Sequence, residues 1–207
     1  MPTIPAEKLS VNTIIERRFK FGSEIAGLGG DEQFVKSKAS GKIYQGIYGN
    51  NIIFSTEIEG GILSMNKGYS KVVDRFVLGG RSFRGFKYLG IGPRELSGGR
   101  YTIPLGGEKY AIARLAASFP LGLPRELGLY GSVFAEAGSL WDIKTDPSVA
   151  GLSDKVALTD RALRTSIGFA MNWETPIGPL QFNWSRPQKY LEADSLEYFS
   201  LNLATRF

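Results

Sequence analysis

The feature that most constrains the fold is an alternation of apolar and polar residues over stretches of about ten residues. In the final stretch, YFSLNLATRF, one parity consists of Phe199, Leu201, Leu203, Thr205 and Phe207. Because successive side chains of a β-strand point to opposite faces, this pattern predicts a strand with one apolar face and one polar face. TSIGFAMNW and PLQFNWS repeat the pattern, and the ETPIGP between them supplies the proline and glycine of a tight hairpin.

The same alternation recurs upstream. Residues 17–27, 32–47 and 51–63 have the pattern of a meander of strands joined by GLGGD and YGNN. KYAIARLAASFPLG and LGLYGSVFAEAG follow after a glycine-rich segment, and no helical period of useful length is present. The sequence therefore predicts an all-β fold, an antiparallel meander of about eight long strands.

Alternation alone fits two kinds of surroundings. A soluble sandwich would bury the apolar face, whereas an outer-membrane barrel would expose it to lipid. The strands are long, and aromatic residues gather towards their ends, at Trp173, Trp184, Phe199 and Phe207. These features favour a transmembrane β-barrel.

Composition excludes several functions. The chain contains no cysteine and no histidine, which removes disulfides, thiolate metal sites and the usual general base. Zinc chemistry and Ser-His-Asp or Cys-His catalysis are excluded by this content, whereas a carboxylate-based enzyme stays possible in principle. Because no nucleophile–base pair is visible, we expect no enzyme, no catalytic residue, no metal and no cofactor. The net charge is +5, but the positive residues are scattered and no basic helix accompanies them. The sequence predicts no nucleic-acid partner.

A long glycine-rich segment, RFVLGGRSFRGFKYLGIGPREL, runs from Arg75 to Leu96 without strand or helix period. Its SFRGF motif, preceded by DRFVLGG and followed by GIGPR, resembles the signature of the outer-membrane β-barrel insertase superfamily, the BamA family. AGLGGD, SFPLGLP, FAEAGSLW and PIGPLQFNWSRP resemble the same family in the same order, as does the final Phe207. The resemblance runs over nearly the whole chain.

The resemblance implies that the loop bearing Arg-Gly-Phe folds back into the barrel lumen, where its arginine pairs with acidic residues of the wall. The matching residues here are Arg84, Gly85 and Phe86, and the acidic position of FAEAG is Glu136. Glu136 shares its parity with Tyr130, Ser132 and Phe134, which would place it on the inner face. A second acid expected in the family falls on Ala116, a departure that would leave the arginine with one anchor. The alternative without a functional role is that Arg84 is an ordinary surface arginine and Glu136 a solvated carboxylate.

Family barrels have about 16 strands, so the matched residues correspond to the C-terminal half of such a barrel. We expect residues 1–207 to comprise a strand meander (15–63), a lumenal loop (about 74–107) and C-terminal strands (108–207), without periplasmic repeat domains. A closed eight-stranded barrel is too narrow to hold that loop, and an open sheet exposes unpaired edges. The sequence is therefore expected to be part of a longer protein or of a divided one.

The function implied by the resemblance is the folding and insertion of β-barrel proteins into the bacterial outer membrane through a lateral seam between the first and last strands. The last strand, with Phe199, Leu201, Leu203 and Phe207, would serve as pairing edge and assembly signal. The implied partners are unfolded outer-membrane β-barrel proteins, outer-membrane lipids and accessory lipoproteins. Two alternatives remain at this point, a polypeptide-secreting transporter of the same superfamily and a small closed structural barrel.

Overall fold

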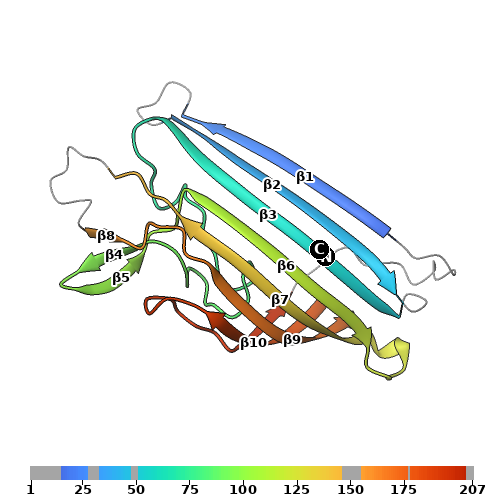
Figure 1. The fold of residues 1–207 in the computed structure, drawn as a ribbon. Helices are drawn as coiled ribbons and strands as arrows, with labels where there is room; N and C mark the ends of the chain where they lie inside the picture. The colour runs from blue at the N-terminus through green and yellow to red at the C-terminus, as the bar shows by residue number, and fades with distance from the viewer. Residues whose placement is uncertain (1–14, 28–32, 48–50, 146–154, 177, 204–207) are drawn as a thin grey trace.

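The computed structural model describes residues 15–27, 33–47, 51–145, 155–176 and 178–203. Within these residues, eight strands form one antiparallel sheet in the order β1-β2-β3-β6-β7-β9-β10-β11 (Figure 1). They are β1 (Ile15–Ala26), β2 (Gln33–Ile47), β3 (Ile52–Lys67), β6 (Lys109–Pro120), β7 (Leu129–Trp141), β9 (Arg164–Thr175), β10 (Gly178–Lys189) and β11 (Phe199–Leu203). The predicted all-β meander is confirmed.

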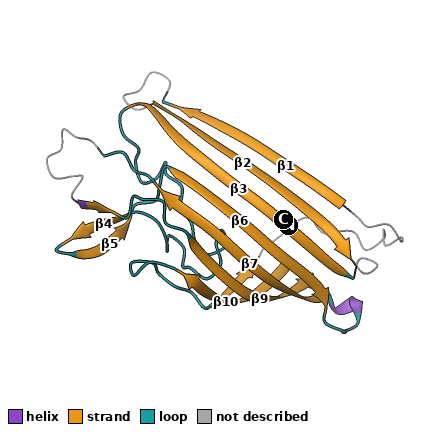
Figure 2. Cartoon of the chain, in the orientation of Figure 1, coloured by secondary structure: helices purple, strands orange, loops and turns teal. Residues whose placement is uncertain are grey.

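Helical structure is almost absent from the described part of the chain. Figure 2 shows strands joined by loops, with a short 3-10 turn at Arg125–Leu127 between β6 and β7. No helix among the described residues is long and apolar enough to cross a membrane.

The connections at the two ends of the sheet differ in length. Residues 176–177 lie between β9 and β10, and residues 121–128 join β6 to β7. At the opposite end, residues 68–108 join β3 to β6, residues 142–163 lie between β7 and β9, and the shorter 190–198 join β10 to β11. We call these ends the turn end and the loop end of the sheet. In outer-membrane barrels, short turns face the periplasm and long loops face outwards.

Residues 68–108, the inner connection, fold back against one face of the sheet instead of projecting from it. Buried apolar side chains of the connection (Phe76, Leu78, Phe83, Phe86 and Ile91) form one cluster with strand residues (Leu63, Tyr110, Ile112 and Leu140). The main apolar core therefore lies between the inner connection and the sheet. We call the covered side of the sheet its inner face.

The inner connection is more regular than its sequence predicts. Residues Arg94–Ser97 form β4 and Arg100–Pro104 form β5, and β8 (Val156–Ala157) pairs with β4 to complete a small sheet. The turn between β4 and β5 consists of Gly98 and Gly99, with φ angles of 56° and 75°. Positive φ at both central residues is the type I′ geometry that favours a hairpin, and two glycines adopt it without strain. Figure 1 shows the small sheet beyond the loop end of the large one.

The two faces of the large sheet have inverted polarity. The inner face buries polar side chains, among them Ser132, Glu136, Ser166, Asn172 and Asn183. The outer face exposes apolar ones, among them Phe19, Phe21, Ile58, Leu115, Val133, Ile167, Phe169 and Leu201. Water would penalise such a large apolar outer surface, whereas hydrocarbon accommodates it. The ambiguity left by alternation is thus resolved in favour of a sheet that faces lipid.

Candidate functional site

Arg84 of the inner connection binds Glu136 of β7, so the structure brings these two predicted residues together. The Arg84 Nε and Nη2 atoms each lie 2.6 Å from Glu136 Oε1. The Arg84 backbone N–H donates to Glu136 Oε2 at 2.7 Å, so both carboxylate oxygens accept. Glu136 is only 3% exposed. A buried carboxylate with this many donors holds the backbone as well as the side chain of the loop in place.

The ring of Phe134 supports the guanidinium from below, because Arg84 Cζ lies 3.4 Å from the ring centroid. Burial lowers the pKa of Arg84 while the negative charge of Glu136 opposes that shift. Arginine remains protonated at neutral pH even so. The pair is therefore an ion pair stacked on an aromatic face, an arrangement in which arginine and lysine are not interchangeable.

Gly85 and Phe86 fit the loop against β9 and the core. Gly85 has a φ of 92°, and a Cβ there would approach the Ser166 Cβ to 2.9 Å. The Ser166 hydroxyl donates to the Arg84 carbonyl at 2.6 Å, so the loop backbone lies directly against the strand. Phe86 is fully buried and stacks on Phe83 with ring centroids 5.1 Å apart.

Strand register places Glu136 in a continuous row of polar residues across the inner face. Lys42 pairs with Glu57, Glu57 with Arg114, Arg114 with Glu136, and Glu136 with Ser166, each directly across neighbouring strands. We call this the charged row. Its charges alternate in sign from Lys42 to Glu136, an order in which adjacent strands attract. Lys42 and Glu57 form an ion pair at 3.2 Å.

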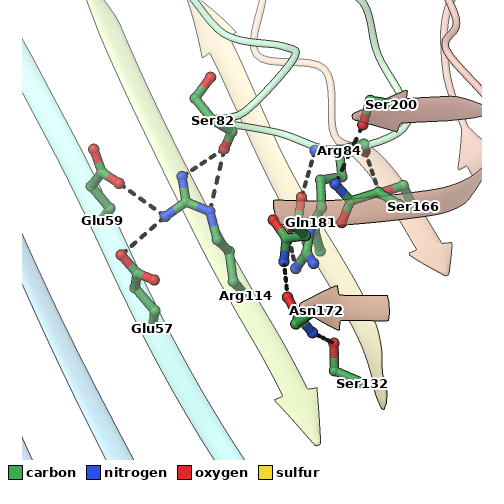
Figure 3. Close-up of polar contacts among 12 residues, drawn as sticks. Glu57, Glu59, Ser82, Arg84, Arg114, Ser132, Ser166, Asn172, Gln181 and Ser200 are labelled. Carbon is green, nitrogen blue, oxygen red and sulfur yellow. Dashed lines mark hydrogen bonds and ion pairs between the residues drawn. The ribbon is translucent and has the colours of Figure 1, made fainter. Parts of the chain in front are cut away.

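A second anchor of the inner connection comes from Arg114 on β6, which sequence reasoning did not identify. Its Nη2 donates to the Ser82 carbonyl at 2.6 Å, and its Nη1 lies 2.9 Å from Glu59 and 3.3 Å from Glu57. Figure 3 shows Arg114 reaching between the two glutamates and the loop backbone at Ser82. The absence of an acid at Ala116 therefore does not leave the loop with a single anchor, since Arg114 lies two residues earlier on the same face.

Arg114→Ala in the complete protein that carries this chain should loosen the loop less than loss of the Glu136 anchor. Glu57 keeps Lys42 and Glu59 keeps the Tyr110 hydroxyl, so both acids retain a partner. We expect a loss of about 1.5–3 kcal/mol, the range for hydrogen bonds to charged groups. Thermal unfolding of the purified protein measures it, with the exposed Arg100→Ala as control. Equal melting temperatures for the two variants would contradict an anchoring role.

Towards the turn end, the inner face continues as uncharged polar pairs. The Gln181 side chain donates to Asn172 at 2.9 Å, and Asn172 donates to Ser132 at 3.2 Å (Figure 3). No group of histidine, cysteine, aspartate or glutamate suited to a metal ion is found in the described residues. The site as a whole is a docking surface for the inner connection.

The predicted residues of the last strand face the other way. Phe199, Leu201 and Leu203 lie exposed on the outer face of β11, and the Phe199 ring centroid lies 5.5 Å from that of Trp184. Phe207 lies outside the described residues, and its role in assembly stays a prediction. The two sets of predicted residues thus belong to opposite faces of the sheet.

Comparison with protein families gives a match to the Omp85 superfamily domain over residues 17–207. The chain is 27% identical over 189 residues to the outer membrane protein assembly factor BamA of Neorickettsia risticii, covering 91% of this chain and 24% of the relative. It is 31% identical to the BamA of Neisseria meningitidis serogroup B, covering 72% of this chain and 21% of that protein. A mouse sorting and assembly machinery component 50 homolog is 36% identical over 59% of this chain and 26% of its own length.

Among solved structures, BamA from Haemophilus ducreyi lacking POTRA domains 1-3 has a similar fold. The TM-score is 0.78 at 21% identity, and the match covers 90% of this chain and 37% of that one. The chain thus spans about a quarter of the length of the two BamA relatives.

Proposed function

Because the chain belongs to the Omp85 superfamily, we propose that it forms the C-terminal half of an outer membrane protein assembly factor that inserts β-barrel proteins through a lateral seam. The chain is a segment of an outer-membrane β-barrel, in which the inner face lines the lumen and the outer face meets lipid. Two of its relatives are an outer membrane protein assembly factor and a sorting and assembly machinery component 50 homolog.

The observation that carries the proposal is the fixed position of the inner connection across the lumenal face. The connection is held by the ion pair of its Arg84 with Glu136 of β7, by the hydrogen bond from Arg114 of β6, and by its own apolar cluster. A polypeptide passing through the lumen would have to break all of these contacts. Substrate that pairs with a strand edge at the seam would leave them intact, so assembly is favoured over secretion through the pore.

The edges of the sheet support the same route. β11 is the last strand of the sheet and pairs with β10 alone among the described residues. An edge strand offers unpaired N–H and C=O groups, and an extended substrate segment can satisfy them by strand addition.

We propose further that the mechanism contains no step in which a covalent bond is made or broken. The work of the protein would be to bind an unfolded outer-membrane strand by its main chain and to release it into lipid after pairing. Accessory lipoproteins would contact the other regions of the complete protein. Outer-membrane lipids would border the exposed aromatic and aliphatic side chains of the outer face.

Conditional depletion of the complete protein in its own organism tests this function. We expect the folded, heat-modifiable forms of outer-membrane β-barrel proteins to fall several-fold, while their unfolded precursors accumulate. Gel electrophoresis of unheated membrane samples measures both forms. Normal barrel levels combined with loss of one secreted polypeptide would instead favour the transporter.

A further inference from the structure

The inner connection is hydrogen-bonded to the segment that leads into the last strand, as well as to the barrel wall. The Lys87 N–H donates to the Ser195 carbonyl at 2.9 Å, and the Ser195 N–H donates to the Gly90 carbonyl at 2.8 Å. The Glu197 N–H donates to the Gly85 carbonyl at 2.9 Å. These bonds form a short antiparallel ladder, which we call the clasp.

Side chains reinforce the clasp from the core. Phe86 and Leu196 form an antiparallel bridge at its centre. Phe86 belongs to the buried apolar cluster, and Leu196 packs against that cluster. The segment before β11 is therefore part of the same packed unit as the inner connection.

A fully buried ion pair holds the other side of this segment. Arg164, the first residue of β9, donates from Nε and Nη2 to the two carboxylate oxygens of Asp194, each at 3.1 Å. Both side chains are 0% exposed. Asp194 also accepts from the Leu191 N–H at 2.7 Å, and Arg164 donates to the Ala162 carbonyl at 2.8 Å. With these partners the pair is well satisfied, which is the condition under which a buried ion pair can persist.

Successive contacts of the inner connection link Glu136 on β7 to the start of β11. Arg84 is bound to Glu136 on β7, and the adjacent Gly85 accepts from Glu197, two residues before β11 begins at Phe199. The inner connection thus spans from β7 to the start of the last strand, past the intervening β9 and β10. The Glu197 contact lies two residues before the start of β11 at Phe199.

The clasp acts at one end of β11. Phe199 pairs with Trp184, towards the loop end of β10, and Leu203 pairs with Leu180, near the turn end. We infer that the clasp and the Arg164–Asp194 pair position the last strand by fixing its loop end. Separation of β11 at the seam then begins at the turn end of the strand. Arg164 and Asp194 are positioning residues, since they act on the seam through the segment that they hold.

The consequence for substrates rests on the proposed function. An incoming strand would begin to pair with β11 at the turn end, on the periplasmic side, and would meet the fixed end last. The positional claim itself concerns only this chain and can be measured without any substrate.

Hydrogen exchange of the complete protein in lipid nanodiscs tests the inference. Asp194→Asn removes the charge that Arg164 requires. The matched control is Glu192→Gln, because Glu192 is exposed and lies two residues away. In Asp194→Asn we expect exchange of peptides covering residues 85–90 and 195–203 to accelerate together, by about tenfold or more. Peptides covering Lys42, Glu57 and Arg114 should remain as in the wild type, and Glu192→Gln should change neither region.

Arg164→Lys gives a milder variant if Asp194→Asn folds poorly. It keeps the positive charge but loses the bidentate geometry, so exchange in the two regions should rise together by a smaller factor. Faster exchange confined to residues 190–194, with 85–90 and 199–203 unchanged, would overturn the inference in either variant. Folded outer-membrane protein levels in the same strains test the proposed function separately. Coupled exchange with normal levels would uphold the clasp and count against that function.

Discussion

Arg84→Ala in the complete protein is expected to release the inner connection and to reduce folded outer-membrane proteins more than any other single change considered for this chain. The substitution leaves Glu136 buried without its cation, and Glu136 is 3% exposed. Removing one partner of a buried ion pair costs about 3–5 kcal/mol, because the remaining charge stays buried without its countercharge. The stacking of Arg84 on Phe134 is lost as well. Heat-modifiability of the protein itself and the levels of its client barrels measure the effect.

Two further variants separate the ion pair from other consequences of the change. Arg81 is exposed on the same loop, so Arg81→Ala should behave like the wild type. Exchange of the two charges, Arg84→Glu with Glu136→Arg, should recover part of the folded protein. Recovery should be incomplete, because the backbone N–H of residue 84 loses its carboxylate acceptor. Normal growth and normal outer-membrane protein levels in Arg84→Ala cells would show that the pair has no role in assembly.

The parity of strand residues was enough to place some of this site from sequence. Alternation put Glu136 on the face opposite Val133 and put Leu201 on the apolar face, and both follow from the period of a strand. The resemblance to a family supplied Arg84 as the partner of an inward acid. Each of these steps uses only spacing within one segment or a motif carried by contiguous residues.

Register could not be obtained in the same way. The charged row depends on Glu57, Arg114 and Glu136 standing directly opposite one another on three strands. A shift of one residue in either pairing would break the row, and no local pattern specifies that shift. Arg114 was missed for this reason, although it shares the inward parity of Tyr110 and Ile112. Arg164 and Asp194 meet across 30 residues, for which the sequence contains no signal.

The β4–β5 hairpin is a different case, because a signal was present. The SGGR turn carries the Gly-Gly pair typical of two-residue hairpins. Its strands are short and lie within a segment rich in glycine and proline, so they show no extended alternation. Most of β5 is exposed, so no buried apolar face imposes an alternation on the hairpin that the sequence could show.

Gly168→Ala is expected to weaken the anchoring of Arg84 by displacing the Phe134 ring on which the guanidinium stacks. Gly168 stands directly across from Phe134 in the β7–β9 register. A Cβ at this position would collide with the Phe134 ring and with the Trp184 carbonyl on the other neighbouring strand. The ring cannot stay beneath Arg84 without the space that the glycine leaves. Overpacking of this kind costs about 1–3 kcal/mol, and displacement of the ring adds the loss of its stacking on Arg84.

Gly22→Ala on β1 is the matched control, because a Cβ there would meet nothing within 4 Å. It should leave the melting temperature of the purified protein unchanged or raise it slightly, since alanine restricts the unfolded chain more than glycine. Gly168→Ala should lower it clearly and should accelerate hydrogen exchange in residues 79–90. Adding Phe134→Leu should restore part of the stability by removing the ring from the collision, but not the protection of the loop, since Arg84 would still lack its aromatic face. If Gly168→Ala and Gly22→Ala have the same melting temperature and residues 79–90 stay protected from exchange, Gly168 does not determine the position of Phe134 beneath Arg84.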